Sequence, residues 1–318
     1  MNALIIPVYK NEETISELLQ ALGIIHRDLG GDLTVTFVVD GSPDRCHELL
    51  RDALAKVDFP STLILHSRNF GSFAAIRTGL QFTEADFYAV MAADLQEPTS
   101  LIMEFFKTLS SKAGDLVLGA RDGRKDPWSS KILSEIFWGL YRRYIIKELP
   151  KGGVDIFGCN RQVRDKVLEF GEARSSLVAQ LMWVGFKRTV VLYQRQPRLK
   201  GKSAWTFQKK VDYLMDSIFS FTDLPIKILI KIGAFGTCTS FLVGIVVIVS
   251  RLTGLTTVSG YTALMIAIIF FGAMNLLGLG IIGSYAQRGY ENTKQRPLAI
   301  VSGTLTFKKE LNDGLLRT

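Results

Sequence analysis

The sequence predicts an α/β domain with a mainly parallel sheet, followed by two helices that cross a membrane. Three observations carry this prediction. Short apolar, β-rich runs alternate with amphipathic stretches over residues 1–160, which is typical of a parallel sheet covered by helices on both faces. The chain combines 47% apolar with 21% charged residues. Residues 232–287 contain a single charge, Arg251, so charged and apolar residues occupy different parts of the chain.

Length and composition exclude several classes of protein. The 318 residues are enough for one large or two ordinary domains. Lys and Arg number 38 against 30 Asp and Glu, which gives a formal charge of +8. The segregated charge excludes an ordinary soluble globule, a disordered chain and a collagen-like repeat. The 3 cysteines and 3 histidines are scattered, which argues against a disulfide framework or a zinc site.

The first 100 residues carry the strand–helix alternation. We expect strands over residues 3–8, 33–39, 61–67 and 87–93, with helices between them over residues 13–25, 44–56 and 71–82. In such sheets ligands bind at the carboxyl ends of the strands. Asp40 and Asp94 follow the second and fourth strands, where two acids are unusual for solvated surface. The sequence lacks a G-x-G-x-x-G after the first strand and a G-x-x-x-x-G-K-[ST], which disfavours a dinucleotide dehydrogenase and a P-loop ATPase.

The apolar region is long enough for two membrane spans. A span needs about 20 apolar residues, and residues 230–250 and 262–286 each provide that length. A pair of core helices in a soluble protein is the alternative, which two adjacent segments of this length disfavour. Basic residues precede the first span and follow the second, so the positive-inside rule predicts an integral cytoplasmic-membrane protein with both termini cytoplasmic. These flanking residues are Lys227, Lys231, Arg288, Lys294 and Arg296.

Two amphipathic stretches and a basic segment lie between the sheet and the spans. Residues 129–147 and 209–222 each carry an apolar stripe suited to a membrane interface, although packing on the sheet is an equal alternative for the first. Residues 187–210 hold eight basic residues and no acid. Nucleic acid is one partner for such a segment. Its position before a membrane span favours an anionic headgroup or a phosphate.

The expected organisation has four parts. Residues 1–208 form the α/β domain, residues 209–228 an amphipathic juxtamembrane helix, residues 229–287 the two spans with a short external turn, and residues 288–318 a cytoplasmic tail. Small residues on the spans, such as Gly278, allow helices to pack closely and are compatible with a homo-oligomer.

Short motifs run along the chain in order. They are Ile6–Glu12, Val39–Asp44, Arg68–Gly71, Asp94–Pro98, Gly152–Asp155 with Asn160-Arg161, and Arg198-x-x-Gly201-x-Ser203-x-Trp205. Followed by two spans and Gln295-Arg296-Pro297, they resemble glycosyltransferase family 2 over nearly the whole chain. The most similar branch is membrane-tethered and includes bactoprenol glucosyltransferases and dolichyl-phosphate mannose synthases. The resemblance implies a GT-A fold, which is Rossmann-like with a mainly parallel sheet.

The resemblance also implies a reaction. An inverting transferase would move a hexose, glucose from UDP-glucose, onto polyprenyl (undecaprenyl) phosphate at the cytoplasmic face, with Mg²⁺ or Mn²⁺ as cofactor. Mannose from GDP-mannose is the second choice. The implied catalytic residues are Asp155 and Asp94, and the implied metal ligands are Asp94 and Gln96. The implied sugar-nucleotide residues are Pro7, Tyr9, Glu12, Asp40, Asn69 and Gly71, and the implied acceptor residues are Arg198, Lys200, Ser203 and Trp205.

Two positions depart from the family pattern. Val39 and Ala92 stand where the family often has Asp. Because Ala92 has no ligand atom, a metal would rest on Asp94, with help from Gln96 and the donor diphosphate. An acceptor phosphate has a second pKa of about 6 and is nucleophilic without help. Asp155 is therefore either a general base or a group that orients the acceptor or a metal.

Three other functions remain as alternatives. A processive polysaccharide synthase would carry Q-x-x-R-W, but Gln180-Leu-Met-Trp183 lacks the Arg. A non-catalytic, sugar-nucleotide-binding membrane scaffold is compatible with Ala92. A nucleic-acid binder would fit the basic excess, but the sequence carries no aromatic-basic RNA or DNA module.

Overall fold

The structure, a computed structural model, describes residues 1–122, 148–150, 153–172, 175–196, 207–253 and 260–307, together with Gly139, Arg142, Arg143 and Ile146. The chain forms two compact units. Unit 1 is Met1–Lys210 with Arg296–Thr318, and unit 2 is Val211–Gln295. The amphipathic stretch expected over residues 129–147 and the basic segment around Arg198 fall largely or wholly outside the described residues.

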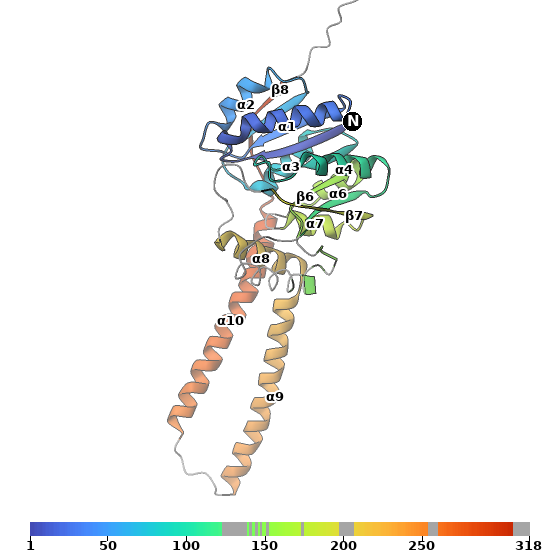
Figure 1. Cartoon of the computed structure of the whole chain (residues 1–318). Helices are drawn as coiled ribbons and strands as arrows, with labels where there is room; N and C mark the ends of the chain where they lie inside the picture. The colour runs from blue at the N-terminus through green and yellow to red at the C-terminus, as the bar shows by residue number, and fades with distance from the viewer. Residues whose placement is uncertain are drawn as a thin grey trace, which may run out of the picture. The chain divides into compact units, whose positions relative to one another are not determined.

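Unit 1 is built on one sheet of mostly parallel strands (Figure 1). The strand order is β7-β5-β6-β4-β1-β2-β3-β8. β1 to β4 are mutually parallel, β5 and β7 are parallel to each other, and β6 and β8 run antiparallel to their neighbours. The strands are β1 Asn2–Val8, β2 Leu33–Val39, β3 Ser61–His66, β4 Phe87–Val90, β5 Leu116–Arg121, β6 Ile156–Asn160, β7 Arg188–Tyr193 and β8 Val301–Phe307.

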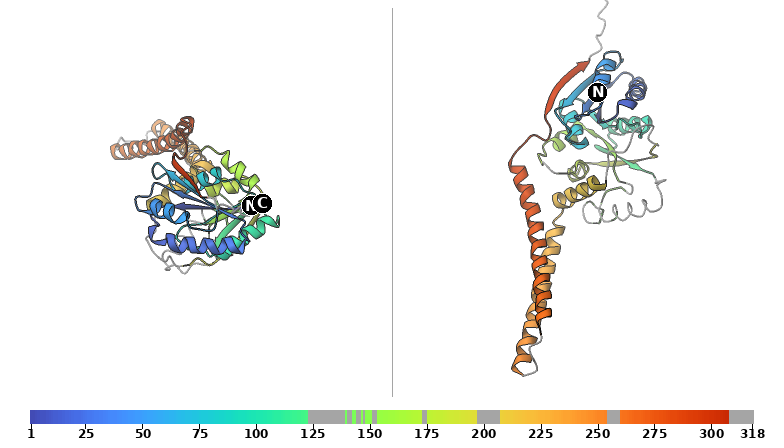
Figure 2. Two further views of the ribbon diagram at one scale, coloured as in Figure 1. Left: turned by 90° about the horizontal axis from the view of Figure 1, so that it is seen from above. Right: turned by 90° about the vertical axis from the view of Figure 1, so that its left-hand side faces the viewer.

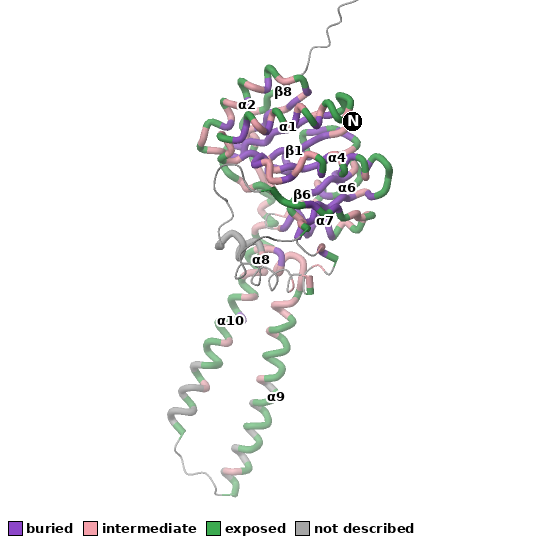
Figure 3. Tube along the Cα trace, in the orientation of Figure 1, coloured by how far each residue is buried: buried purple, intermediate pink, exposed green. Residues whose placement is uncertain are grey.

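Helices cover both faces of this sheet, which explains why its central strands are continuous apolar runs. Buried residues concentrate in the strands and on the helix sides that face them (Figure 3). Gly79 lets α3 approach closely, because a Cβ there would lie 2.3 Å from Ile5 Cγ2. The helices of unit 1 are the 3₁₀ turn η1 Glu12–Thr14, α1 Ile15–Asp28, α2 Cys46–Leu54, α3 Ser72–Phe82, α4 Thr99–Ser110, α6 Arg161–Leu168 and α7 Leu177–Trp183.

The strands and helices of the first 100 residues match the sequence prediction closely, with one difference that bears on the site. The fourth strand, predicted to reach residue 93, ends at Val90. Its pairing with β1 stops at Ile5, and the Met91 N–H donates to the Ile5 carbonyl at 3.1 Å. Asp94 therefore lies in a turn beyond the strand and does not extend it.

The C-terminal strand β8 was not predicted. Residues 288–318 were expected to form a separate tail, but Val301–Phe307 pairs antiparallel with β3 at the sheet edge (Figure 2). The Ser67 N–H also donates to the Ile300 carbonyl at 2.9 Å. The chain thus leaves unit 1 after Lys210 and returns to it at Arg296.

Unit 2 consists of long helices. It contains most of α8 Phe207–Phe221 and all of α9 Leu224–Leu252 and α10 Tyr261–Thr293. Within it, Arg288 Nη2 donates to Asp216 Oδ1 at 2.8 Å, and the rings of Phe219 and Tyr285 meet edge-on with centroids 5.0 Å apart. Among the described residues, one stretch is long and apolar enough to cross a membrane. It is Leu224–Val243 in α9, with a mean hydropathy of 1.6.

Arg77 joins α3 to the end of α6. Its guanidinium donates to the carbonyls of Val167, Leu168 and Phe170 and to the side-chain oxygen of Gln180. Burial lowers the pKa of Arg77, opposed by the charge of Glu172, but an arginine stays protonated in proteins. The guanidinium therefore satisfies carbonyl groups in the last turn of α6 and just after it, which have no donor within the helix.

We expect Arg77→Met to destabilise unit 1 by about 2–3 kcal/mol, because several carbonyls lose a charged donor at once. Thermal unfolding of the full chain in detergent measures the change. Arg51→Met is the matched control, since Arg51 pairs with its exposed neighbour Asp52, and such surface pairs contribute about 0–1 kcal/mol. Equal losses in the two variants would contradict this role for Arg77.

Candidate active site

Most of the predicted site residues lie along one edge of the sheet, the one formed by the carboxyl ends of its parallel strands. The carboxyl ends of β1, β2 and β3 lie side by side, as the pairs Val8↔Val39 and Val39↔Leu65 show, and parallel β4 ends beside Ile5 of β1. β5 and β7 end at the same edge, and β6, being antiparallel to β5, begins there. The residues placed along this edge are Pro7 at the end of β1, Tyr9 and Glu12 after β1, Asp40 after β2, Asn69 and Gly71 after β3, Asp94 and Gln96 after β4, and Asp155 before β6.

Asp40 anchors the loop that follows β3. Its side chain is nearly inaccessible, with 2% of the residue exposed. Oδ1 accepts the Phe70 N–H at 2.8 Å and shares a 2.8 Å hydrogen bond with His66 Nδ1, and Oδ2 accepts the Gly71 N–H at 2.8 Å. The next residue, Gly41, has φ +55°, and a Cβ there would lie 2.2 Å from the Arg68 carbonyl carbon. The Asp-Gly pair therefore sets the backbone course of the loop that contains Asn69.

We expect Asp40→Asn to weaken donor binding more than turnover. An amide NH₂ facing the N–H groups of Phe70 and Gly71 would displace a loop far from the reacting carbon, which is a loss of uniform binding. A donor Kd raised about tenfold corresponds to the loss of about 1.4 kcal/mol. Calorimetric titration with the nucleotide measures it. Asp86→Asn is the control, and collapsed turnover with an unchanged donor KM would contradict the assignment.

A second set of hydrogen bonds joins the loops after β1 and β2. Asp44 accepts from Ser42 Oγ at 2.6 Å and from the Glu12 N–H at 3.2 Å. In return, Ser42 Oγ accepts the Lys10 N–H at 2.8 Å. Burial opposes the charge of Asp44, but these bonds and those from Cys46 outweigh it and keep its pKa below the usual range. The backbone on either side of Tyr9 and Glu12 is thereby fixed.

The turn after β4 carries two buried carboxylates, Asp94 and Glu97. Leu95 between them adopts a left-handed conformation with φ +55°, which costs a non-glycine residue free energy and persists only where surrounding contacts impose it. The Gln96 N–H donates to Asp94 Oδ1 at 3.4 Å. Thr14 Oγ1 donates to the Ala93 carbonyl at 3.0 Å, which ties the start of the turn to η1.

Glu97 is a site residue that the sequence analysis missed. It is 3% exposed, and its Oε2 has no hydrogen-bond partner among the described residues. Burial raises its pKa to about 7, the negative charge of Asp94 adds to the shift, and Arg195 opposes it. The available signal was an acid directly after the Asp-Leu-Gln motif.

The oxygen atoms of this turn suit a hard divalent cation. Mg²⁺ is usually held by one or two carboxylates together with substrate phosphates. Asp94 and Glu97 supply two carboxylates, and the buried Oε2 of Glu97 has no donor within the described part of the chain. The described part of the chain contains no cluster of three or more His, Cys, Asp or Glu residues that would hold a metal alone. The donor set therefore fits an ion whose coordination is completed by a diphosphate.

Asp155 lies in a polar cluster at the ends of β5 and β7. Arg121 donates to both carboxylate oxygens, from Nη2 to Oδ1 at 2.9 Å and from Nε to Oδ2. The Tyr193 hydroxyl donates to Oδ2 at 2.8 Å. Burial and the charge of Asp155 raise the pKa of Tyr193. Burial opposes the charge of Arg121, but the bonds to Asp155 prevail and raise its pKa. The cluster therefore holds the Asp155 carboxyl group between the Arg121 guanidinium and the Tyr193 hydroxyl.

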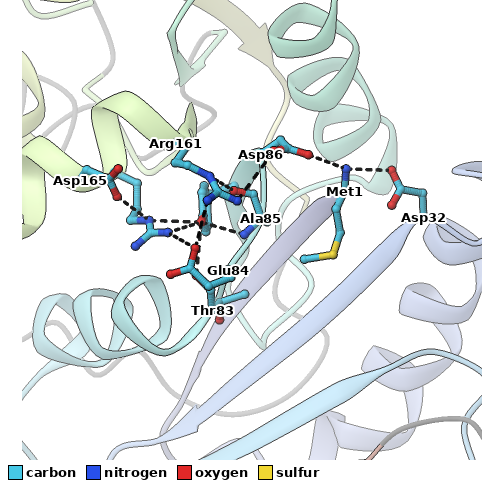
Figure 4. Close-up of polar contacts among 10 residues, drawn as sticks. Met1, Asp32, Thr83, Glu84, Ala85, Asp86, Arg161 and Asp165 are labelled. Carbon is cyan, nitrogen blue, oxygen red and sulfur yellow. Dashed lines mark hydrogen bonds and ion pairs between the residues drawn. The ribbon is translucent and has the colours of Figure 1, made fainter.

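The opposite edge of the sheet holds a separate ion network (Figure 4). The Met1 ammonium contacts Asp86 at 3.0 Å and Asp32 at 3.4 Å. Arg161, from the motif that the resemblance placed near the acceptor, donates to the Ala85 carbonyl at 2.9 Å and pairs with Glu84. These groups lie at the amino ends of β1 and β4, so Arg161 is separated from the candidate site by the length of the strands.

The predicted acceptor residues fall outside the described part of the chain. Arg198, Lys200, Ser203 and Trp205 belong to residues 197–206, between the described Gln196 and Phe207. Arg195 and Gln196 lie beside the turn after β4. The Gln196 N–H donates to the Gln96 carbonyl at 2.9 Å, and Gln96 Nε2 donates to the Gln196 carbonyl at 3.2 Å.

Comparison with known proteins gives consistent relatives. The profile of glycosyl transferase family 2 matches residues 3–171. An uncharacterized glycosyltransferase of Synechocystis is 30% identical over 301 residues, covering 94% of both chains. The bactoprenol glucosyl transferase of Shigella phage SfX is 28% identical over 300 residues, covering 94% of this chain and 98% of that protein. Among solved structures, S. aureus TarS 1–349 with UDP-GlcNAc aligns at TM-score 0.44 and 15% identity, covering 64% of this chain and 61% of that one.

Proposed function

The chain belongs to glycosyltransferase family 2, and from this premise we propose that it transfers glucose from UDP-glucose to a polyprenyl phosphate at the cytoplasmic face of a membrane. The observation that carries the proposal is the collection of the donor-side motifs and Asp155 at one sheet edge. Relatives named bactoprenol glucosyl transferase align along nearly their whole length, which supports the lipid acceptor.

The residues at this edge divide the work of such a transfer. Pro7, Tyr9 and the loop held by Asp40 lie where the nucleotide would bind. Asp94 and Gln96, with Glu97 beside them, would hold a divalent ion, which neutralises the charge that develops on the departing diphosphate. The acceptor phosphate attacks the anomeric carbon directly, so a single displacement inverts its configuration. Asp155 orients Arg121 and Tyr193 around the acceptor, since both of its oxygens already accept hydrogen bonds.

We also propose that α9 and α10 both cross the membrane. Both ends of this helical hairpin connect to unit 1, so the chain must cross an even number of times if it crosses at all. The basic residues at both ends, Lys227 and Lys231 before the first span and Arg288 after the second, support placing unit 1 at the cytoplasmic face.

A non-catalytic sugar-nucleotide-binding protein is the second candidate, because Ala92 removes one carboxylate that the family often has at this turn. GDP-mannose in place of UDP-glucose is an alternative donor for the same chemistry.

One experiment tests these functions together. Purified full-length protein in detergent is incubated with undecaprenyl phosphate, Mg²⁺ and labelled UDP-glucose or GDP-mannose, and the lipid fraction is analysed by mass spectrometry. We expect a polyprenyl phosphate bearing one glucose. A mannolipid would change the donor, and nucleotide binding without any lipid product would favour the non-catalytic protein.

The acceptor assignment has its own test in Arg198. We expect Arg198→Ala to raise the acceptor KM about ten- to a hundredfold, because one charge-assisted contact contributes about 1.5–3 kcal/mol, while nucleotide affinity stays unchanged. The measurement uses a short-chain acceptor in neutral detergent, where leaflet charge is absent. If Arg198 instead attracts the domain to anionic lipid, the variant will be normal under these conditions.

A further inference from the structure

Arg195 donates a hydrogen bond to the Gln96 side-chain oxygen, which the proposed metal ion would use as a ligand. Its Nη2 donates to Oε1 of Gln96, the amide oxygen of the turn between the buried Asp94 and Glu97. The backbones of Gln96 and Gln196 are joined by a second hydrogen bond of 2.9 Å. Arg195 is exposed, and the backbone hydrogen bond of its neighbour Gln196 keeps it next to Gln96.

A metal and the guanidinium are poorly compatible on one amide oxygen. A bound Mg²⁺ or Mn²⁺ would lie about 2 Å from that oxygen, and an arginine donor about 3 Å from it. The two positive centres would then be about 5 Å apart or less, where like charges repel even through a high effective dielectric. In this structure the cation bound to the Gln96 side-chain oxygen is Arg195.

The surroundings of Glu97 also favour replacement of the Arg195 guanidinium by a metal ion. Its Oε2 is buried and without a hydrogen-bond partner among the described residues, although Arg195 is close enough to interact with its charge. The charge of Arg195 thus acts on Glu97, while Oε2 of Glu97 accepts no hydrogen bond from the described residues. A metal ion would coordinate this oxygen, and this additional contact would favour release of the guanidinium.

We propose that Arg195 and the divalent ion compete for the Gln96 amide oxygen, so that metal binding displaces Arg195. This inference rests on the metal dependence contained in the proposed function. It assigns Arg195 as a positioning residue that holds the metal-free turn, and it links residues 195–196, which lie within the basic segment 187–210, to the occupancy of the donor site.

The test is direct titration of the full-length protein with Mn²⁺, alone and with UDP, following free Mn²⁺ by electron paramagnetic resonance. We expect Arg195→Met to bind Mn²⁺ about three- to tenfold more tightly than the wild type, as removal of one partly solvated like charge predicts. Arg195→Lys keeps the charge and should stay near the wild type. If Arg195 instead only supports the shape of the turn, the Met variant will bind Mn²⁺ less tightly, and the sign separates the two roles.

Two controls make the result specific. Arg51→Met removes one positive charge on α2, where Arg51 pairs with Asp52, and should leave Mn²⁺ affinity unchanged. In a Gln96→Ala background, Arg195→Met should have a smaller effect, because the shared oxygen that holds the guanidinium at the turn is gone. Unchanged or weaker Mn²⁺ binding by Arg195→Met overturns the competition. Absence of Mn²⁺ binding in every variant overturns it together with the metal requirement, whereas the lipid product assay tests glucosyl transfer independently.

Discussion

Asp94→Ala should reduce glycolipid formation by about a thousandfold or more at saturating donor. The substitution removes the carboxylate that anchors the turn after β4, where Ala92 already contributes no ligand. Because negative charge builds on the diphosphate as it leaves, the loss should appear in kcat and not only in KM. Initial rates over a range of UDP-glucose concentrations, with product counted in the lipid fraction, measure the effect.

A matched control variant tests whether the loss of activity is specific to Asp94. Asp52→Ala removes an exposed carboxylate on α2 and should retain full activity and an unchanged melting temperature. Mn²⁺ titration of Asp94→Ala adds a second readout, in which we expect a clear loss of affinity. Normal turnover in this variant would place the metal on other residues. Glu97 is the first to examine, because its Oε2 has no hydrogen-bond partner among the residues that the structure describes.

The fold could be predicted where local sequence determines it. Strands buried on both faces are continuous apolar runs, and β1, β2 and β3 were recognised almost to the residue for this reason. β8 was not predicted because Val301–Phe307 mixes small and polar residues with apolar ones, as an edge strand can. Its partner β3 lies more than 230 residues earlier in the chain, and no local pattern encodes such a pairing.

The site residues were likewise predictable only where local sequence determines them. Asp40 and Asp94 were found because an acid after a buried strand is unusual. Arg121 and Tyr193 were not, since a charged or aromatic residue at a strand end resembles ordinary surface until the sheet order brings β5, β6 and β7 together. The contact between Arg195 and Gln96 depends on residues 99 positions apart, so only the folded chain reveals it.

Asp155→Asn is expected to lower kcat about a hundredfold. The neutral amide leaves the guanidinium of Arg121, whose side chain is only 19% exposed, without its counter-charge. Charge-assisted hydrogen bonds contribute about 1.5–3 kcal/mol each, and two are lost or weakened. An amide NH₂ also faces the donors of Arg121, so the guanidinium should turn away from its present position.

The pH dependence separates the two roles left open for Asp155. If the carboxylate accepts a proton in the reaction, Asp155→Asn removes the acidic limb of the kcat profile that its own ionisation creates. If it orients Arg121 and Tyr193, as the three hydrogen bonds on its oxygens indicate, the profile keeps its shape at a lower level. We expect the second outcome, measured between pH 5 and 8 in the range where an acceptor phosphate of pKa about 6 also titrates.

Two further variants show whether Asp155 and Arg121 act as one unit. Tyr193→Phe removes one hydrogen bond to the carboxylate and keeps the ion pair, so it should lower kcat less than Asp155→Asn, which also disturbs both bonds from Arg121. Arg121→Lys combined with Asp155→Asn should be no worse than the more damaging single substitution, because partners in one network are not additive. Multiplicative losses would mean that Asp155 acts independently of Arg121, as a base would, and would restore the general-base role.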